Sequence, residues 1–216
     1  MYEDPLFPAW HEMALRMVEY LNLPEGPVAW AMTEVPRHRF LPRNLWNSAY
    51  YDTPLPVGPE ATISAPHMVA LQLEAIGIKD GHHILDIGSG SGYLAALAAV
   101  IGGPSCKVVG IEIETELAQR SRIAIEEIAL EDRILIHGGD GAEGYPPDAP
   151  YDRIMVSYAV QYPFPEKWRE QLKDDGVMVA PIDRGRGTYL EKLEKTLPKG
   201  WKVDRGPPCL FVASKP

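Results

Sequence analysis

The sequence predicts an α/β fold, a doubly wound and mostly parallel sheet with helices on both faces. From Ser64 onward, short and continuously apolar segments alternate with amphipathic helical patterns, which is typical of parallel strands covered on both faces. A glycine-rich loop (88–92) follows the first of these strands, at the end where open parallel sheets bind ligands. Two tail segments, "TYLEKLEK" and "CLFVAS", can add antiparallel strands at one edge.

The residues before Ser64 are predicted to form helices followed by an irregular connection. Residues 9–34 carry helical periodicity, interrupted by the turn "LPEGP". Residues 42–60 are rich in Pro, Asn, Tyr and Gly. A helix is predicted from about Pro66 to Ile76, because Pro tolerates the first turn and Gly77 is a suitable C-terminal cap. Ser64 is expected to cap this helix, since its hydroxyl can accept an orphan backbone N–H.

The alternating part is predicted to hold five strands. In chain order we expect strand 83–87, a helix after Ser91, strand 107–111, helix 115–130, strands 133–138 and 152–157, a helix near 165–173 and strand 177–182. The tail strands would be 188–195 and 209–214.

Length and composition indicate how many domains the chain forms and which classes of partner are disfavoured. At 216 residues the chain is expected to form a single domain (1–216), with an N-terminal helical and irregular extension (1–60), a cofactor-binding core (61–183) and C-terminal strands (184–216). The net charge of −9 argues against nucleic acid as a partner. No apolar run reaches membrane-spanning length and no signal-peptide pattern opens the chain, so we expect a cytoplasmic protein with no membrane partner. Cys106 and Cys209 are expected to be buried, inert thiols.

The glycine loop departs from the dinucleotide fingerprint. Glycines stand at 88, 90 and 92, and glycine lets the backbone approach a ligand closely. A G-x-G-x-x-G pattern would need its third glycine at position 93, which is Tyr. The loop therefore suits a ligand other than NAD.

Three acidic residues at successive strand ends indicate which ligand. Asp86 lies two residues before Gly88, where a carboxylate would repel a pyrophosphate but suits an ammonium or hydroxyl groups. Glu112 ends the next strand and can accept both hydroxyls of a ribose. Asp140 follows the third of these strands, where a carboxylate can hold an exocyclic amine. The set suits a nucleoside with a cationic, amino-acid-like tail, a description that fits S-adenosyl-L-methionine.

Five blocks in order resemble one known family. "VPRHRFLP" (35–42), "AYYDTPLPVG" (49–58), "ATISAPHMVALQLEAI" (61–76), "ILDIGSGSGY" (84–93) and "GDGAEGYPPDAPYDRIMV" (139–156) resemble the blocks of protein-L-isoaspartate (D-aspartate) O-methyltransferases. The glycine loop alone would fit any class I methyltransferase with a Rossmann-like fold. The "TISAPHM" segment is far more specific.

The resemblance implies an activity and a set of site residues. It implies methyl transfer from S-adenosyl-L-methionine to L-isoaspartyl and D-aspartyl residues of damaged proteins, with repair through a succinimide. The segment 61–68 would fold over the cofactor, and Ser64 would be the catalytic residue. The expected cofactor-binding residues are Ala61, Thr62, Ile63, Ser64, Asp86, Gly88, Ser89, Gly90, Gly92, Glu112, Ile113, Asp140 and Gly141.

The available residues agree with that chemistry. A carboxylate acceptor is already ionised at neutral pH, so the reaction requires no general base. The enzyme has to supply orientation and exclusion of water, and the Ser64 hydroxyl can hold one carboxylate oxygen while the other attacks. The sequence contains no Ser/His/Asp triad signature, no paired catalytic carboxylates and no metal motif. His82, His83 and His137 stand beside strands and are expected to serve as capping or surface residues.

One segment departs from the family and leaves alternatives open. After "DRIMV" the family continues with small residues and a proline, whereas this chain reads "SYAVQYPFP". Ser157, Tyr158, Gln161 and Tyr162 are therefore predicted to line the substrate mouth, unless the aromatic rings pack on the N-terminal helices. The expected partner is a peptide or protein carrying isoaspartate, and the protein is expected to be a monomer. Two alternatives are the same chemistry on another carboxylate, and a catalytically silent cofactor-binding protein, which would not need the Ser64 hydroxyl.

Overall fold

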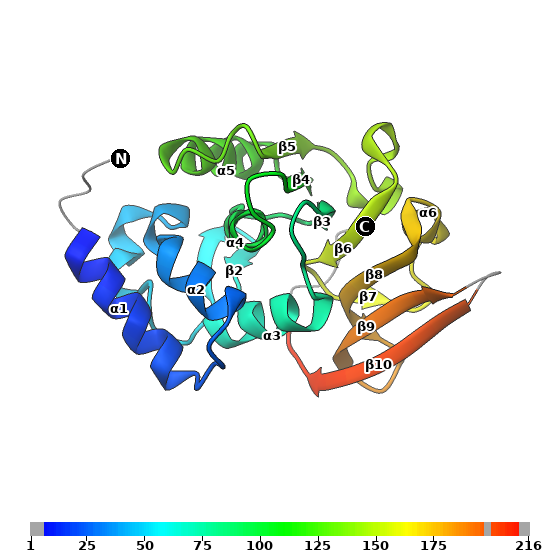
Figure 1. Cartoon of the computed structure of the whole chain (residues 1–216), viewed down its shortest axis with the longest axis horizontal. Helices are drawn as coiled ribbons and strands as arrows, with labels where there is room; N and C mark the ends of the chain where they lie inside the picture. The colour runs from blue at the N-terminus through cyan, green and yellow to red at the C-terminus, as the bar shows by residue number, and fades with distance from the viewer. Residues whose placement is uncertain (1–6, 197–199, 212–216) are drawn as a thin grey trace.

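A mostly parallel sheet forms the centre of the protein (Figure 1). The computed structural model describes residues 7–196 and 200–211. The strands of the main sheet are β3 (His83–Ile87), β4 (Lys107–Glu112), β5 (Ile134–Gly138), β6 (Tyr151–Val156), β7 (Val160–Gln161), β8 (Leu172–Asp183), β9 (Thr188–Thr196) and β10 (Gly200–Pro208). Their order is β10-β9-β8-β6-β3-β4-β5, with β7 paired to β8. The pairs from β8 to β5 are parallel, and β9 and β10 add an antiparallel edge, so the predicted fold class is confirmed.

Alternation along the strands divides the core between the two faces of the sheet. In β3, Ile84 packs into one apolar cluster while Leu85 and Ile87 pack into the other, because successive side chains of a strand point to opposite sides. The first face is covered by α3 (Pro66–Ile76), α4 (Tyr93–Ile101) and α5 (Thr115–Glu127). The other face carries α6 (Glu166–Glu170), η3 (Gly141–Glu143) and η4 (Pro146–Asp148). Helical cover is thus much heavier on the first face, as Figure 1 shows.

The N-terminal part contains more regular structure than the sequence predicts. The two expected helices are α1 (Phe7–Tyr20) and α2 (Pro27–Glu34), and α2 packs on α3 and α4. They are followed by η1 (Arg37–Phe40), η2 (Arg43–Ser48) and the antiparallel pair of β1 (Leu55–Gly58) with β2 (Ala61–Ile63). Residues 42–60 were expected to be irregular. Two prolines and a glycine hide β1 in the sequence, yet Leu55 and Val57 are buried on one side of it.

The last strand is not the one that the sequence predicts. Within the described residues, 209–211 belong to no strand, and 212–214 lie outside them. The edge strand is β10, which is mostly exposed and has little apolar alternation. Residues 209–211 after β10 line the cavity described below, and Cys209 is buried there. The strand prediction for "CLFVAS" is therefore wrong at 209–211.

The order of the strands reverses at β3, and this reversal creates the site. β3 is the first strand of the sheet in the chain, and it lies between β4 on one side and β6 on the other. Ile87 at the end of β3 pairs with both Ile111 and Val156. The loops that leave β3 and β6 therefore diverge, and such a switch point opens a crevice at the carboxyl ends of the strands.

Two further expectations concern thiols and membrane spans. Cys106 and Cys209 are both buried, as predicted, and burial raises the pKa of each thiol to about 11. Among residues 7–196 and 200–211, no helix has the length and apolar character needed to cross a membrane.

Leu73 on α3 tests the packing of the first face. Leu73 is 1% exposed inside the cluster, whereas Leu71 on the same helix is 40% exposed. Leu73→Ala should lower the free energy of unfolding by about 2–5 kcal/mol, because the deletion leaves a cavity. Leu71→Ala should change it by about 0.5 kcal/mol or less. Urea unfolding measures both, and equal effects would contradict this packing.

Candidate active site

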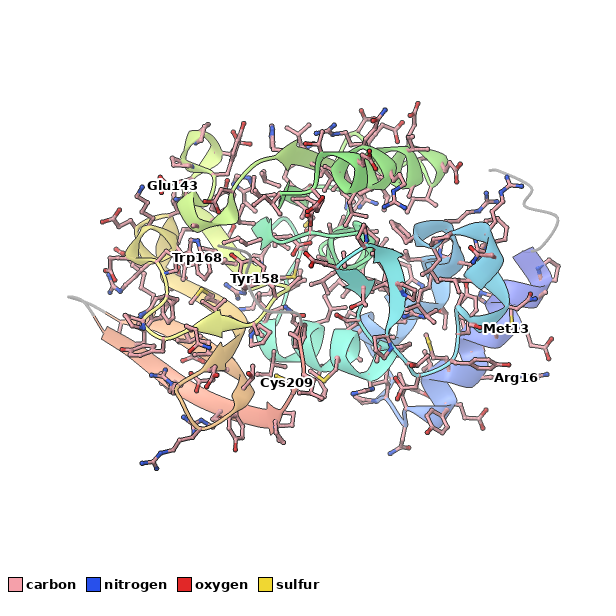
Figure 2. The ribbon with its side chains drawn as sticks, turned by 180° about the vertical axis from the view of Figure 1, so that it is seen from behind. Met13, Arg16, Glu143, Tyr158, Trp168 and Cys209 are labelled. Carbon is pink, nitrogen blue, oxygen red and sulfur yellow. The ribbon has the colours of Figure 1, made fainter. Side chains whose placement is uncertain are left out.

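A large cavity lies at the carboxyl ends of the parallel strands. Its volume is about 1040 Å³. Its walls come from the segment before and at the start of α3, the glycine loop, the ends of β4, β5 and β6, α6, the start of β9 and the tail after β10. Tyr158, Trp168 and Cys209 are three of its lining residues (Figure 2). The side chains of α1, such as Met13, lie at the other end of the molecule in the same view.

The glycine loop is fixed to the neighbouring strand and uses its glycines for different purposes. The backbone N–H groups of Gly88 and Ser89 both donate to the Ile111 carbonyl, at 2.8 and 2.9 Å. Gly88 and Gly90 have positive φ and line the cavity. Gly92 also has positive φ, but a Cβ there would lie 3.2 Å from Ser121 and Ile125 of α5. Gly92 therefore permits helix packing, while the other two expose backbone to the cavity.

Glu112 is held rigidly by two backbone groups. Its side chain is buried at the end of β4. One carboxylate oxygen accepts the Gly90 N–H at 2.8 Å, and the other accepts the Glu114 N–H at 2.9 Å. Each oxygen keeps a second lone pair. Glu112 thus presents two oriented acceptors to the cavity, an arrangement that suits a pair of ribose hydroxyls.

Asp86 and Asp140 differ in their relation to the cavity. Asp140 lines it and caps η3 by accepting the Ala142 N–H at 2.9 Å. Asp86 lies beneath the loop with no exposed surface and does not line the cavity. Its Oδ1 accepts the Ser157 hydroxyl at 3.2 Å, and its Oδ2 has no partner among the described residues. Burial raises the pKa of Asp86 to about 7, with a further contribution from Glu112.

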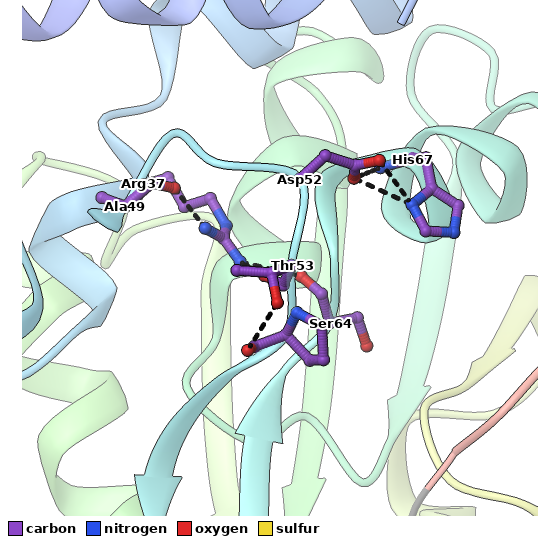
Figure 3. Close-up of polar contacts among 7 residues, drawn as sticks. Arg37, Ala49, Asp52, Thr53, Ser64 and His67 are labelled. Atoms are coloured by element: carbon purple, nitrogen blue, oxygen red, sulfur yellow. Dashed lines mark hydrogen bonds and ion pairs between the residues drawn. The ribbon is translucent and has the colours of Figure 1, made fainter.

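Arg37 ties together the segment that carries Ser64. The guanidinium is fully buried and donates to the carbonyls of Ala49, Thr53 and Ser64 (Figure 3). The bond to Thr53 is 3.2 Å and that to Ser64 is 3.0 Å. The segment from Ala49 to Thr53 and the segment that carries Ser64 therefore share one donor group. This link fixes the backbone of Ser64 at the edge of the cavity, which Ser64 lines.

Ser64 does not cap α3, which corrects the expectation from sequence. The N-cap is Ala65, with no side-chain bond at that position. The Asp52 carboxylate accepts the His67 backbone N–H at 3.0 Å and contacts the His67 imidazole at 2.8 Å (Figure 3). Asp52 supplies the capping acceptor from a loop that local sequence spacing does not reveal. Within the described part of the chain, the Ser64 hydroxyl has no hydrogen-bond partner, so it is available to a ligand.

The predicted site residues separate into two groups. Those that line the cavity are Ala61, Thr62, Ser64, Gly88, Gly90, Glu112, Ile113, Asp140, Gly141, Ser157, Tyr158 and Gln161. Those that do not are Ile63, Asp86, Ser89, Gly92 and Tyr162. Ile63 and Ser89 are buried under the lining segments. Tyr162 is half exposed, with the Arg184 guanidinium 4.1 Å from its ring centroid.

The aromatic residues of "SYAVQYPF" do not pack on the N-terminal helices. Tyr158 packs against the apolar cluster on the opposite face of the sheet, so that alternative is wrong. Gln161 donates to Asp183 at 3.1 Å, at the start of the turn between β8 and β9. The histidines near the strands have local partners: the His82 ring accepts the Lys79 N–H, and His137 stacks on Tyr145. Residues 7–196 and 200–211 contain no His, Cys, Asp and Glu group arranged to hold a metal.

Several lining residues escaped the sequence analysis. Trp168 on α6 donates to the Gly141 carbonyl at 2.9 Å, which fixes the loop after β5. Tyr189 of β9 and the tail from Pro208 to Phe211 close the side of the cavity. The only sequence signal for the tail is its run of apolar residues, which reads equally well as a strand.

The residues present fit S-adenosyl-L-methionine. Gly88 and Gly90 offer a close backbone approach, Glu112 offers paired acceptors, and Asp140 offers a third carboxylate. The buried Asp86 carboxyl, whose pKa is about 7, adds negative potential under the loop when it is ionised, and this favours a cationic ligand. The parallel sheet and this set of strand ends define a class I S-adenosylmethionine-dependent methyltransferase.

Comparison with known proteins identifies the family. The profile of the protein-L-isoaspartate (D-aspartate) O-methyltransferase family matches residues 13–215, and the chain belongs to this family. It is similar to the protein-L-isoaspartate O-methyltransferase of Ignicoccus hospitalis, with 44% identity over 86% of this chain and 87% of that protein. The Methanopyrus kandleri protein of the same name is 39% identical over 97% of this chain and 93% of its own length.

Solved structures agree with this assignment. One protein-L-isoaspartate O-methyltransferase superposes with a TM-score of 0.81 at 28% identity, covering 95% of this chain and 66% of that one. A Plasmodium falciparum protein assigned to the same activity, solved with S-adenosyl-L-homocysteine, gives a TM-score of 0.81 at 25% identity, covering 95% and 98%.

The buried carboxyl of Asp86 should make folding stability depend on pH. Its pKa is about 7 in the folded chain and about 3.9 when unfolded, so the folded chain binds more protons between these values. The contribution of Asp86 to stability is fully present below about pH 4 and is lost as the pH rises to about 7. Urea unfolding of the parent and of Asp86→Asn across this range measures it. The difference in unfolding free energy, parent minus variant, should decrease with rising pH. The same difference for exposed Asp132→Asn should stay flat, and a flat result for Asp86 would contradict the effect of burial.

Glu112 should contribute directly to cofactor affinity. Glu112→Gln keeps the side-chain size but replaces one acceptor oxygen with a donor. We expect S-adenosyl-L-methionine binding to weaken by about 1.5–3 kcal/mol, the usual range for hydrogen bonds to charged groups. Titration calorimetry measures this change. Glu116→Gln, on the exposed first turn of α5, removes the same charge away from the cavity and is the control. Equal affinities of the two variants would rule out the contact.

Proposed function

We propose that the cavity holds S-adenosyl-L-methionine and the acceptor carboxylate together, with Ser64 orienting the acceptor. The chain is a protein-L-isoaspartate O-methyltransferase by family, and this activity requires both groups in one site. Glu112, Asp140 and the glycine loop would hold the cofactor. Ser64 would face the acceptor.

The single observation that carries this proposal is the unused hydroxyl of Ser64. Ser64 lies on the cavity wall, and Arg37 fixes its backbone. The Ser64 hydroxyl is not needed as a cap for α3, because Asp52 supplies the capping acceptor. A hydroxyl that makes no hydrogen bond to the described residues, on a segment whose backbone is fixed, is suited to bind a ligand. Its donor proton matches a carboxylate oxygen, which is an acceptor only.

Methyl transfer to a carboxylate requires the protein to do little more than position the two reacting groups. The bound cofactor supplies a methyl group on a positively charged sulfur. Ser64 would donate to one oxygen of the acceptor carboxylate and leave the other free to attack. No residue has to remove a proton, because the carboxylate is ionised at neutral pH. Orientation of this kind can account for several kcal/mol of the barrier.

Exclusion of water would come from the two segments that flank the cavity. Residues 61–68 form one wall, and the tail from Pro208 to Phe211 forms another. Displacing water strengthens the attraction between the carboxylate and the cationic cofactor. The glutamate and aspartate at the strand ends would repel the acceptor carboxylate from the cofactor half of the cavity and keep it near Ser64.

The acceptor would be an isoaspartyl residue in a damaged protein, and its methyl ester would close to a succinimide. We propose that the protein acts as a monomer in the cytoplasm and without nucleic acid. The net charge of −9 disfavours a polyanionic partner.

Ser64→Ala separates orientation from stability. Loss of one hydrogen bond to a charged acceptor should lower kcat about 10- to 100-fold on an isoaspartyl peptide. Because Asp52 provides the cap, the unfolding free energy should change by about 0.5 kcal/mol or less. Radiolabelled methyl transfer and thermal melts measure the two effects. Exposed Ser105→Ala is the control, and an aspartyl twin of the peptide should stay unmethylated. A Ser64→Ala variant with parental turnover would remove Ser64 from catalysis.

A further inference from the structure

Tyr158 lies directly on the glycine loop. It follows β6 by two residues, and Gly88 follows the adjacent strand β3 by one. A Cβ built on Gly88 would lie 2.5 Å from Cδ1 and 3.0 Å from Cε1 of the Tyr158 ring. Any side chain at position 88 would therefore displace the ring. The contact joins the two loops that diverge at the switch point of the sheet.

The far end of Tyr158 points toward the acidic strand ends. Its hydroxyl lies 3.5 Å from the place of a Cβ on Gly141. Burial raises the pKa of Tyr158 to about 12, and the carboxylates of Asp140 and Glu112 add to this. The side chain is thus a neutral phenol, and its ring lies between the glycine loop and these two carboxylates. Sequence reasoning assigned it to the acceptor side of the mouth, but these neighbours belong to the cofactor half.

The charge that distinguishes the cofactor from its product is the positive charge on its sulfur. Under the proposed function, Glu112 and Asp140 hold the nucleoside, and the glycine loop holds the amino-acid tail. The sulfur joins these two parts, so it would lie between the glycine loop and the ends of β4 and β5, in the part of the cavity that Tyr158 lines. Methyl transfer breaks the carbon–sulfur bond and leaves its electron pair on sulfur, so the positive charge of the sulfonium is lost in the product.

We propose that the Tyr158 ring binds the sulfonium and makes the site prefer S-adenosyl-L-methionine to S-adenosyl-L-homocysteine. An aromatic face attracts a cation within about 6 Å and offers no such attraction to a neutral sulfur. The two ligands share their ammonium, ribose and base, so other contacts affect them nearly equally. The ring would act by favouring release of the product. This inference rests on the proposed placement of the cofactor.

The test compares the affinities of the two ligands in the whole protein. Calorimetry gives the Kd of each for the parent, Tyr158→Phe and Tyr158→Leu. The ratio of the Kd for S-adenosyl-L-homocysteine to that for S-adenosyl-L-methionine should fall about 3- to 30-fold in Tyr158→Leu. Tyr158→Phe keeps the ring and should retain the parental ratio within about twofold, as expected for cation–π binding. Tyr162→Leu, which removes a ring outside the cavity lining, should also retain it.

The other outcomes either overturn this proposal or separate it from the acceptor assignment. An equal loss of both ligands in Tyr158→Leu means that the ring only packs, and thermal melts show whether folding is the cause. Tighter binding of both means that the ring occupies space that the cofactor needs. If the parent binds neither ligand, the cofactor assignment fails and this proposal fails with it. If the parent binds both but does not methylate the isoaspartyl peptide, only the acceptor assignment fails, and the Kd ratio still decides the role of Tyr158.

Discussion

One buried cation organises the region on which the site depends. The Arg37 guanidinium donates to three backbone carbonyls, those of Ala49, Thr53 and Ser64. A buried charge must be solvated by the protein, and here backbone dipoles provide that solvation. The same bonds fix where the chain enters α3. The position of Ser64 thus follows from the hydrogen-bonding needs of a side chain 27 residues earlier.

Two kinds of element form the site: a rigid scaffold and the segments that cover the cavity. The parallel strands and the glycine loop hold the acidic groups in place, and Glu112 is itself tied to Gly90 and Glu114. The covering parts are the segment at the start of α3 and the tail after β10. One precedes the parallel strands in the sequence and the other follows the last strand, yet both reach the carboxyl edge of the sheet. The scaffold therefore supplies the charged groups, and under the proposed function the covering segments would contact the acceptor.

Sequence reasoning worked where chemistry is local and failed where it is long-range. Glu112 and Asp140 line the cavity, as predicted, because one ends a strand and the other follows one, and parallel strands end at one edge of the sheet. Asp86 lies inside β3 and does not line the cavity. The cap of α3 was missed because Asp52 lies 15 residues before His67. Tyr162 was assigned to the mouth because of its neighbours in the sequence. Its ring instead stacks on Arg184, which lies in the turn between β8 and β9, and no local pattern in the sequence reveals this contact. The tail was read as a strand because an apolar run gives no sign of what it covers.

The irregular pairing of β10 links the sheet edge to the site. Arg205 pairs with Glu191 and Pro208 with Tyr189, so β10 has one more residue than β9 across this interval. Such a bulge bends a strand and changes the direction of the chain that follows. It also gives the outermost strand an irregular outline that, with its charged side chains and prolines, resists pairing with another molecule. The irregularity that makes this edge a poor template for another strand therefore directly precedes residues 209–211, which line the cavity, so the protection of the edge and the shape of the site depend on the same stretch of chain.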